Sequence, residues 1–291
     1  MPATRQYDEI AYYDGQWGKP SEMRIPLEDR GYIFGEGVYE AFNAFNHVIW
    51  GLEEHLDRLE FSLQFMDMPL PCPRAELTAL LQQAVDMVKS NQQMLYMQLT
   101  RGYSPRRHAY PDVERSTLTI ISRDHTESPS YVDSGGAAIT VADKRWQHCN
   151  IKTLNLIPSA MAAKQAERAG VFASIFHRDG VVTEAQAHNA FMVSGVVVYT
   201  APLSELILPG ITRKHILQIC EQLGIPYKEE YFTVEQMYNA DEVFISSTTK
   251  YPLPIHAVDG HTIGDGATGP ITRRIHAAYL ANIEALCGKI S

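Results

Sequence analysis

Hydrophobic residues follow two different spacings in the first part of the chain. Two stretches place them on one face at three- and four-residue intervals, which predicts helices over 52–66 and 75–90. Residues 94–100 alternate apolar and polar side chains instead, which predicts a strand that pairs with a second strand at 117–122. The link between these strands, residues 101–115, is long for a compact domain and contains prolines, aromatic residues and a cluster of cations. Ordered loops of that length are mostly functional, so we expect this loop to carry part of a site.

Turn and capping signals divide the second part of the chain into short elements. Helices are predicted over 158–169, 211–223 and 271–286, and hairpin turns at Asp179–Gly180 and Asp259–Gly260. Thr233 and Gln236 have the spacing of a capping box at the start of a short helix. The polar stretch Asp124–Ser130 predicts a domain linker. We therefore expect two α+β domains, over residues 1–126 and 127–291, with a ligand cleft between them.

The composition is that of a folded, acidic protein. Of the 291 residues, 45% are hydrophobic and 20% are charged, and the net charge is −9. Binding to nucleic acid or to an anionic membrane needs a basic surface, so neither partner is expected. The N-terminus has no apolar signal region and no apolar stretch is long enough to span a membrane, which makes the cytoplasm the expected location. The four cysteines are scattered, without the spacing of a metal site or a redox pair.

Lys152 is the first candidate for chemistry. In the segment Asn150–Leu156, strand alternation would place it on the same face as Leu154 and Leu156. Apolar neighbours strip water from an ammonium group and favour the neutral amine, which can form an imine with an aldehyde cofactor. A lysine that extends into solvent from a strand end is the alternative explanation.

Glu184 ends the predicted strand Val181–Glu184, and no other charge follows before His188. Such a carboxylate is either exposed at the strand end or buried with a cationic partner. The composition of the segment favours exposure. A pyridinium nitrogen would supply the partner that a buried carboxylate needs.

Three features could bind a phosphate. Arg58 lies on the first predicted helix, where it could clamp a phosphate or form an ordinary surface pair with Glu54. The loop Pro209–Thr212 leads directly into a helix, and N–H groups at such a start bind phosphate well. Ser247–Thr249 follow a predicted strand and offer hydroxyl groups.

The long loop contains three basic residues in a row, Arg106, Arg107 and His108. They form either a solvated tip or a carboxylate trap, because arginine binds carboxylates through two parallel hydrogen bonds and histidine adds a donor. Tyr39 follows a turn between glycines and is either a core residue or part of a cleft.

These segments resemble fold-type IV pyridoxal-phosphate enzymes, and among them bacterial D-amino-acid aminotransferases most closely. Motifs in the family's order and spacing run through nearly the whole chain: Arg30–Glu40, His55–Leu59, Thr100–His108, Ile151–Leu156 with Ala163–Glu167, Val182–Glu184, Gly210–Arg213 and Ser247–Thr249. The resemblance implies an α+β fold with a small N-terminal α/β domain and a larger C-terminal pseudobarrel α/β domain. It also implies a homodimer with the active site at its interface.

The same resemblance implies a role for each candidate residue. Lys152 would form the imine with pyridoxal 5'-phosphate (PLP) and move a proton between substrate and cofactor, while Glu184 would keep the ring nitrogen protonated. The phosphate would bind to Arg58, Ile211, Thr212 and Thr248, with Ser247 beside it. The substrate α-carboxylate would bind to Tyr39 and, from loop 101–115 of the other protomer, to Arg106 and His108.

Two segments depart from the family pattern. The acid at the ring nitrogen is usually followed by a run of small residues, but Ala185–Asn189 contains the bulkier Gln186 and His188. Lys250–Tyr251 stands where a small residue and an acid are usual, and Arg107 adds a cation to the long loop. We expect these changes to leave the imine chemistry intact and to alter the usual preference for D-alanine and D-glutamate.

The expected reaction is a two-stage transamination. A D-amino acid gives its amino group to PLP, and a 2-oxo acid, either 2-oxoglutarate or pyruvate, then takes it. Alternatives within the fold are an aminodeoxychorismate lyase, an aminotransferase for branched-chain L-amino acids and an R-amine transaminase. A non-catalytic ligand-binding relative would be expected to lack the lysine or the ring-facing acid, and both are present. No metal site is expected.

Overall fold

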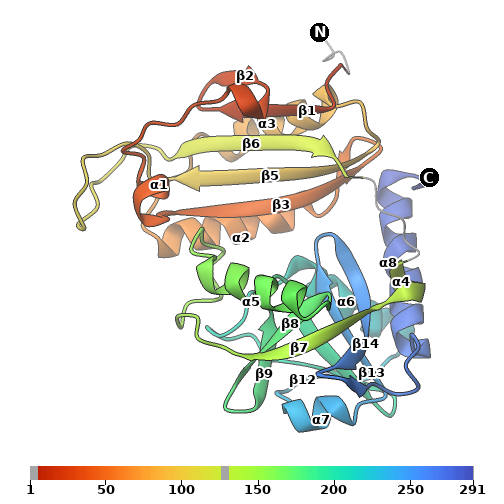
Figure 1. The fold of residues 1–291 in the computed structure, drawn as a ribbon. Helices are drawn as coiled ribbons and strands as arrows, with labels where there is room; N and C mark the ends of the chain where they lie inside the picture. The colour runs from red at the N-terminus through yellow and green to blue at the C-terminus, as the bar shows by residue number, and fades with distance from the viewer. Residues whose placement is uncertain (1–5, 126–130, 291) are drawn as a thin grey trace. The chain divides into compact units, whose positions relative to one another are not determined.

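The computed structural model describes residues 6–125 and 131–290. The chain divides into two compact units, and Figure 1 shows its elements by position along the chain. Unit 1 comprises Met1–Glu127, Ile151–Asn155 and Ile283–Ser291, and unit 2 comprises Ser128–Asn150 and Leu156–Asn282. The predicted domain boundary after residue 126, and most of the predicted linker Asp124–Ser130, lie outside the described residues.

Unit 1 contains, in its described part, a six-stranded antiparallel sheet with the order β2-β1-β6-β5-β3-β4. The strands are β1 (Glu9–Tyr13), β2 (Gln16–Gly18), β3 (Gly37–Phe45), β4 (Val48–Ile49), β5 (Gln92–Thr100) and β6 (Thr117–Asp124). The helices are a 3-10 turn (Pro20–Glu22), α1 (Arg30–Phe34), α2 (Leu52–Phe65) and α3 (Arg74–Met87).

The core of unit 1 lies between this sheet and helices α2 and α3 (Figure 1). In β5, Leu95, Met97 and Leu99 are fully buried, and they alternate with half-buried polar and aromatic residues. The leucines of α2 pack into the same cluster. The predicted helices over 52–66 and 75–90 and the predicted strand pair are therefore confirmed, because each element buries one apolar face in a shared core.

Unit 2 contains, within residues 131–282, a nine-stranded mixed sheet with the order β12-β11-β10-β13-β14-β7-β8-β9, and β15 pairs with β14. The strands are β7 (Gly136–Ala142), β8 (Ala173–Arg178), β9 (Val181–Ala185), β10 (Asn189–Ser194), β11 (Val197–Thr200), β12 (Tyr227–Glu229), β13 (Glu242–Ser247), β14 (Lys250–Val258) and β15 (His261–Thr262). The helices are α4 (Tyr131–Ser134), α5 (Ile157–Arg168), α6 (Ile211–Leu223), α7 (Val234–Tyr238) and α8 (Pro270–Cys287).

The turns of unit 2 match the sequence predictions. Asp179–Gly180 joins β8 to β9 and Asp259–Gly260 joins β14 to β15, and all four residues have positive φ, as the favoured two-residue turn requires. Thr233 and Gln236 form both hydrogen bonds of the predicted capping box. An isolated bridge between Ala185 and His188 brings the end of β9 back to β10, so the sheet curls on itself.

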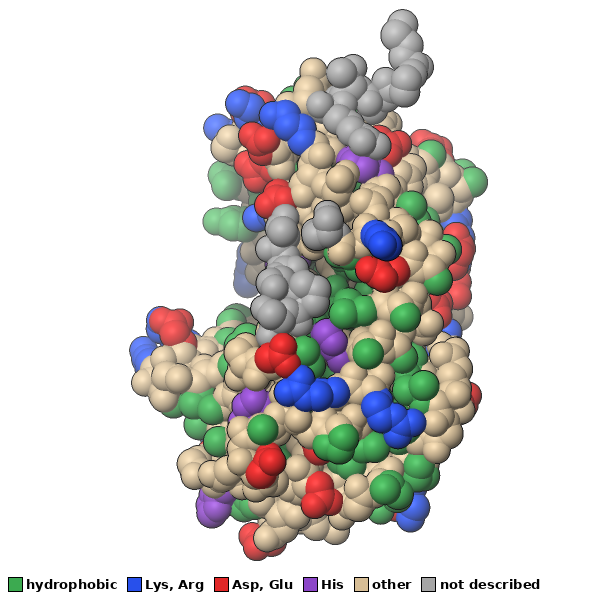
Figure 2. Space-filling model, turned by 90° about the vertical axis from the view of Figure 1, so that its right-hand side faces the viewer, with side chains coloured by type: hydrophobic (Ala, Val, Ile, Leu, Met, Phe, Trp, Pro, Cys, Tyr) green, Lys and Arg blue, Asp and Glu red, His purple; other side chains and the backbone are tan. Residues whose placement is uncertain are grey.

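No helix in the described ranges is both long and apolar enough to cross a membrane. On the face drawn in Figure 2, Lys and Arg side chains are interspersed with Asp and Glu side chains.

Candidate active site

Lys152 lies in the segment Ile151–Asn155, which runs beside the first half of β3 in unit 1. Thr153 forms an isolated antiparallel bridge with Val38. The predicted strand over Asn150–Leu156 is not formed, and Leu156 at its end is 43% exposed. Leu154 is half-buried like Lys152, but the expectation that Leu156 shares an apolar face with them is wrong.

The neighbours of the Lys152 side chain are aromatic instead. Its Nζ lies 4.2 Å from the centroid of the Tyr39 ring, and the Tyr39 N–H donates to the Lys152 carbonyl oxygen over 3.0 Å. The Tyr39 ring in turn lies 5.8 Å from the ring of Tyr96 in β5. The Lys152 N–H donates to Ser62 Oγ in α2 over 3.3 Å. These contacts hold the lysine backbone and place its half-buried side chain over an aromatic face.

Arg58 is buried in unit 1 rather than exposed. Its Nε and Nη2 atoms donate to Glu40 Oε1 and Oε2 over 2.8 and 2.6 Å, and His55 Nδ1 lies 2.7 Å from Oε2. Burial acts to raise the pKa of Glu40, but the Arg58 charge and the hydrogen bonds from both partners outweigh it and lower the pKa to about 2. The alternative of an ordinary surface pair with Glu54 is wrong, because the Arg58 side chain is only 6% exposed.

The long loop of unit 1 is anchored at its base by two buried arginines. Arg30 donates to the carbonyl oxygens of Arg107 and His108 over 2.8 and 3.4 Å. Glu36 accepts from Arg30 with one carboxylate oxygen and from Arg101 with the other. Buried ion pairs and hydrogen bonds to its backbone therefore fix the base of the loop.

The predicted carboxylate-binding residues of the loop both contact Phe34, the last residue of α1. The Arg106 guanidinium lies 5.3 Å from the centroid of this ring, and the His108 ring lies 5.8 Å from it. Both residues are exposed. The structure thus brings these two donors to one place, and their binding of a substrate carboxylate stays a prediction.

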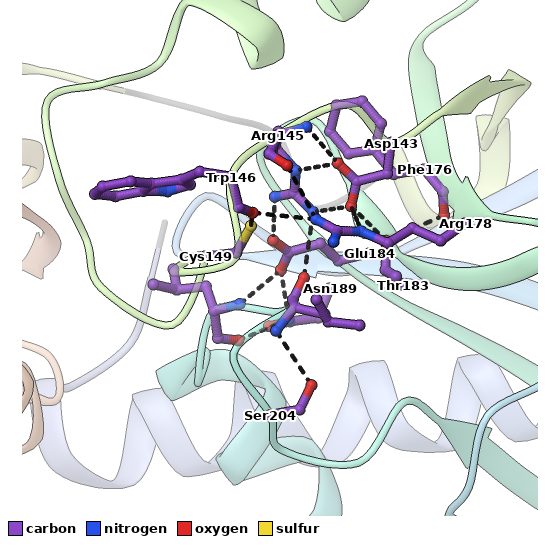
Figure 3. Close-up of polar contacts among 12 residues, drawn as sticks. Asp143, Arg145, Trp146, Cys149, Phe176, Arg178, Thr183, Glu184, Asn189 and Ser204 are labelled. Carbon is purple, nitrogen blue, oxygen red and sulfur yellow. Dashed lines mark hydrogen bonds and ion pairs between the residues drawn. The ribbon is translucent and has the colours of Figure 1, made fainter.

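Glu184 of unit 2 is 4% exposed, so the exposure that its sequence context favours is wrong. Its Oε1 accepts from Arg145 Nη1 over 2.5 Å, and its Oε2 accepts from Asn189 Nδ2 over 3.1 Å and from the Leu208 N–H over 3.0 Å (Figure 3). Burial raises the pKa of Glu184, and the Arg145 charge opposes this rise. Sequence reasoning missed Arg145, because it lies 39 positions from Glu184 and no local pattern marks it.

Asn189 links Glu184 to the start of α6. A Cβ atom at Gly210 would lie 2.0 Å from Asn189 Oδ1, so any larger residue here would force the Asn189 side chain to move. Residues 211–212 follow in the first turn of α6, and both are buried. The N–H groups of a first helical turn have no partner inside the helix and carry the positive end of its dipole, so they form an anion site.

Ser247 and Thr248 lie at the end of a strand in the same sheet. Ser247 ends β13 and pairs with Lys250, so Thr248 lies at the tip of the β13–β14 hairpin. Ser246, one residue before, pairs with Asn189 across β13 and β10. Its Oγ atom is buried and has no hydrogen-bond partner among the described residues. The hairpin end therefore supplies a hydroxyl group that a bound anion could satisfy.

The unusual residues after Glu184 have defined positions. Gln186 Oε1 accepts from the Ser174 N–H over 2.6 Å, so this side chain is bound to the backbone of β8. The His188 ring lies 6.0 Å from the ring of Phe172, and its Nδ1 is buried without a hydrogen-bond partner in the described part of the chain. Burial, and then the charge of Lys250, lower the pKa of His188 to about 4, so its imidazole is neutral near pH 7.

Comparison with known proteins decides the family. Residues 37–258, three quarters of the chain, match the family described as Amino-transferase class IV. The chain belongs to this family. The predicted fold-type IV architecture and PLP-dependent aminotransferase class are thereby confirmed.

Individual relatives of this class IV aminotransferase agree over nearly its full length. It is 40% identical over 276 residues to the D-alanine aminotransferase of Bacillus licheniformis, covering 93% of this chain and 96% of that protein. It is 35% identical over 278 residues to the D-alanine aminotransferase of Staphylococcus aureus (strain MSSA476), covering 95% and 99%. The structure of the branched-chain amino acid aminotransferase from Escherichia coli superposes with a TM-score of 0.86 at 23% identity, covering 94% and 93%, which shows the shared fold.

Each unit of the aminotransferase thus groups part of the predicted site. Unit 1 contains Lys152, Tyr39, Arg58, Arg106 and His108, and unit 2 contains Glu184, Ile211, Thr212, Ser247 and Thr248. Within unit 1 the contact between Lys152 and Tyr39 is direct, and within unit 2 Asn189 connects Glu184 to the start of α6.

Proposed function

We propose that this chain is a D-amino-acid aminotransferase that transfers an amino group from a D-amino acid to a 2-oxo acid through PLP. The observation that supports it most is the 40% identity, over nearly the whole length of both chains, to a protein named D-alanine aminotransferase. Two solved structures of a branched-chain amino acid aminotransferase superpose with TM-scores of 0.88 and 0.89 at 24% identity, which is a likeness of fold. D-amino acids are therefore the better supported substrates.

The described residues fit PLP. The first turn of α6 offers N–H groups to a phosphate, and the buried Ser246 Oγ has no hydrogen-bond partner within residues 6–125 and 131–290. Arg58, Ile211, Thr212 and Thr248 bind the phosphate in this proposal, with Ser247 beside it. Glu184 would accept a hydrogen bond from the protonated ring nitrogen. The bound PLP supplies an aldehyde for covalent attachment and a protonated ring that accepts electrons from the substrate.

Lys152 carries the proton transfer in this proposal. Its amine would hold the cofactor covalently and, when displaced from it, would move a proton between the substrate Cα and the cofactor C4′. The contact with Tyr39 supports this role, because a ring face beside the amine restricts the directions that its side chain can take. Tyr39, Arg106 and His108 bind the substrate α-carboxylate, and 2-oxoglutarate or pyruvate is the amino acceptor.

The chemistry is tested by trapping the attachment site. Borohydride reduction of the PLP-loaded protein, followed by peptide mapping, should place the label on Lys152, and Lys152→Ala should lose both the label and transamination. Lys164→Ala, on the exposed face of α5, is the matched control and should keep both. A label on another lysine, or unchanged turnover in Lys152→Ala, contradicts the proposal.

The substrate class is tested with D- and L-alanine. A shift of the cofactor absorbance with D-alanine but not with L-alanine supports D-specificity, and the reverse points to the branched-chain alternative.

The proposal includes a homodimer in which loop 101–115 serves the partner's active site. Arg106 and His108 are exposed, and the loop also exposes Tyr103 at 63%. Leu27, and Tyr32 in α1, are 79% and 67% exposed. Exposed apolar side chains that gather into one patch mark an interaction surface, which supports a partner at this end of unit 1.

Mixing two inactive variants tests this arrangement. Co-expressed Lys152→Ala and Arg106→Ala chains should regain activity, because a mixed dimer would contain one site with an intact lysine and an intact arginine. No recovery, despite a mixed dimer on native mass spectrometry, would mean that Arg106 serves its own chain.

The cytoplasmic location and the absence of nucleic-acid and membrane partners stay predictions, supported by the net charge of −9 and the interspersed charges of Figure 2.

A further inference from the structure

Glu184 belongs to a buried network of charged side chains. The other members of this network are not among the residues of the family motifs. Arg145 lies in the link between β7 and the Lys152 segment, and its side chain is 11% exposed. Its Nε and Nη2 atoms donate to Asp143 Oδ1 and Oδ2, each over 2.9 Å, and its Nη1 donates to Glu184 Oε1 over 2.5 Å. The guanidinium also lies 4.5 Å from the centroid of the Phe176 ring. Figure 3 shows Arg145 between the two carboxylates.

The hydrogen bonds of Glu184 leave one direction open. A carboxylate has about four acceptor positions, two on each oxygen. Oε2 accepts from Asn189 and from the Leu208 N–H, and Oε1 accepts from Arg145. As far as the described part of the chain goes, the remaining position is therefore on Oε1, the oxygen that also accepts from Arg145.

The charges of the network are balanced. The Asp143 side chain is fully buried and also accepts from Arg178 Nε and Thr183 Oγ1, each over 3.2 Å. Two carboxylates thus face two guanidinium groups. Cys149 is a further titratable group close by, and burial is the main cause that raises its pKa to about 11, so it is an uncharged thiol near pH 7.

Without Arg145, the Glu184 carboxyl group would favour its protonated form over its ionised form. Desolvation disfavours the ionised form of a buried carboxylate, and a cation in contact with it restores that form. Asn189 and Leu208 offer neutral donors, which are weaker than a guanidinium. Glu184 would then hold a proton that it otherwise leaves on its hydrogen-bond partner.

We propose that Arg145 is a positioning residue that keeps Glu184 ionised and aims Oε1, so that the PLP ring nitrogen and not the carboxyl group carries the shared proton. This inference rests on the proposed function, in which Glu184 faces that nitrogen. Only the proton changes place between the nitrogen and Oε1, and the electron pairs stay where they are. A ring that keeps the proton is the stronger electron acceptor, so Arg145 acts on the reaction through Glu184.

The test follows the ring nitrogen directly. The holoenzyme is loaded with PLP that is labelled with 15N in the ring, and its nitrogen NMR shift is recorded for wild type, Arg145→Gln, Arg145→Lys and Arg168→Gln. The last variant removes an exposed arginine at the end of α5 and is the control. We expect a protonated nitrogen in wild type, Arg168→Gln and Arg145→Lys, and an unprotonated one in Arg145→Gln. Turnover should fall about tenfold or more in Arg145→Gln and recover in part in Arg145→Lys, in line with shifts of about one to three pKa units from a contacting charge.

A second variant separates this role from a loss of folding. Arg145→Gln leaves the buried Asp143 with less compensation, so Asp143→Asn/Arg145→Gln is made in parallel, and it should bind PLP with an unprotonated ring. A nitrogen that stays protonated in both variants overturns the inference while the proposed function stands. A wild-type protein that does not bind PLP, or whose ring nitrogen does not respond to Glu184→Gln, overturns the proposed role of Glu184 itself.

Discussion

Arg58 and Glu40 form a two-point ion pair inside unit 1, with both guanidinium–carboxylate distances below 3 Å and the Glu40 side chain fully buried. Glu40 lies in β3 directly after Tyr39, and Arg58 lies in α2, so the pair fixes the helix to the strand that carries the proposed substrate contact. Successive residues of a strand face opposite sides, so Tyr39 faces away from this pair.

Replacing Glu40 with Gln should destabilise unit 1 strongly. The change leaves the buried Arg58 without a carboxylate, and breaking a buried pair in this way costs about 3–5 kcal/mol. Urea unfolding of the cofactor-free protein measures the loss. Glu53→Gln, which breaks an exposed pair with Arg74, is the control and should cost about 1 kcal/mol or less. Equal losses in the two variants would show that Glu40 is as well solvated as Glu53.

The same pair predicts an acid limit of stability. The pKa of Glu40 is lowered from 4.5 to about 2, chiefly because the Arg58 charge outweighs the effect of burial. A carboxyl group whose pKa is lower in the folded state stabilises the fold fully above its unfolded pKa and loses this contribution as the pH falls towards 2. The difference in unfolding free energy between wild type and Glu40→Gln should therefore be constant above about pH 5 and shrink below pH 4.5. A difference that stays constant down to about pH 2.5 would contradict the Glu40 assignment.

Gly210→Ala should weaken PLP binding. The substitution causes no backbone strain, because the φ of Gly210 is −64°, which any residue can adopt. The new Cβ would lie 2.0 Å from Asn189 Oδ1, so Asn189 has to move and loses its hydrogen bonds to Glu184 and the Leu208 carbonyl oxygen. Hydrogen bonds to a charged group contribute about 1.5–3 kcal/mol, so the dissociation constant of PLP should rise by about tenfold or more.

Fluorescence titration of the cofactor-free protein measures that constant. Gly18→Ala, whose Cβ would meet only the flexible end of Met23 and the side chain of Glu22, should leave it unchanged. In an Asn189→Ala background the clash is gone, so Gly210→Ala should add little. A full additional loss in that background would place the effect of Gly210 elsewhere than at Asn189.

The elements that local rules govern could be predicted from the sequence. The Asp179–Gly180 turn and the Thr233–Gln236 capping box depend on neighbouring residues only, and both formed as expected. Helix α2 could be predicted because the spacing of its leucines places them on one apolar face. In each case the interaction that decides the structure lies within a few positions along the chain.

The surroundings of the candidate site depend on residues far apart in the chain, and here prediction failed. The exposure of Glu184 was wrong because its partner Arg145 is 39 positions earlier and invisible to a local pattern. The strand around Lys152 was wrong because alternation over a few residues cannot show that the segment only borders β3 through a single bridge. The identities of these candidates came from matched motifs, but their contacts needed the fold.

His188 should make the protein sensitive to mild acid. Burial, together with the Lys250 charge, lowers the pKa of His188 from 6.5 to about 4. A base whose pKa is lower in the folded state binds its proton more readily after unfolding, so the stability present above pH 6.5 declines as the pH falls towards 4. His188→Asn cannot take up this proton, and the Nδ1 atom that lacks a partner among the described residues is no longer there. Thermal melting between about pH 7 and pH 4 should therefore show a smaller decrease in melting temperature for His188→Asn than for wild type, with Lys250→Met intermediate. Parallel curves for all three proteins would mean that His188 titrates as an ordinary solvated histidine, and the replacement of a small residue at this position would then need another physical explanation.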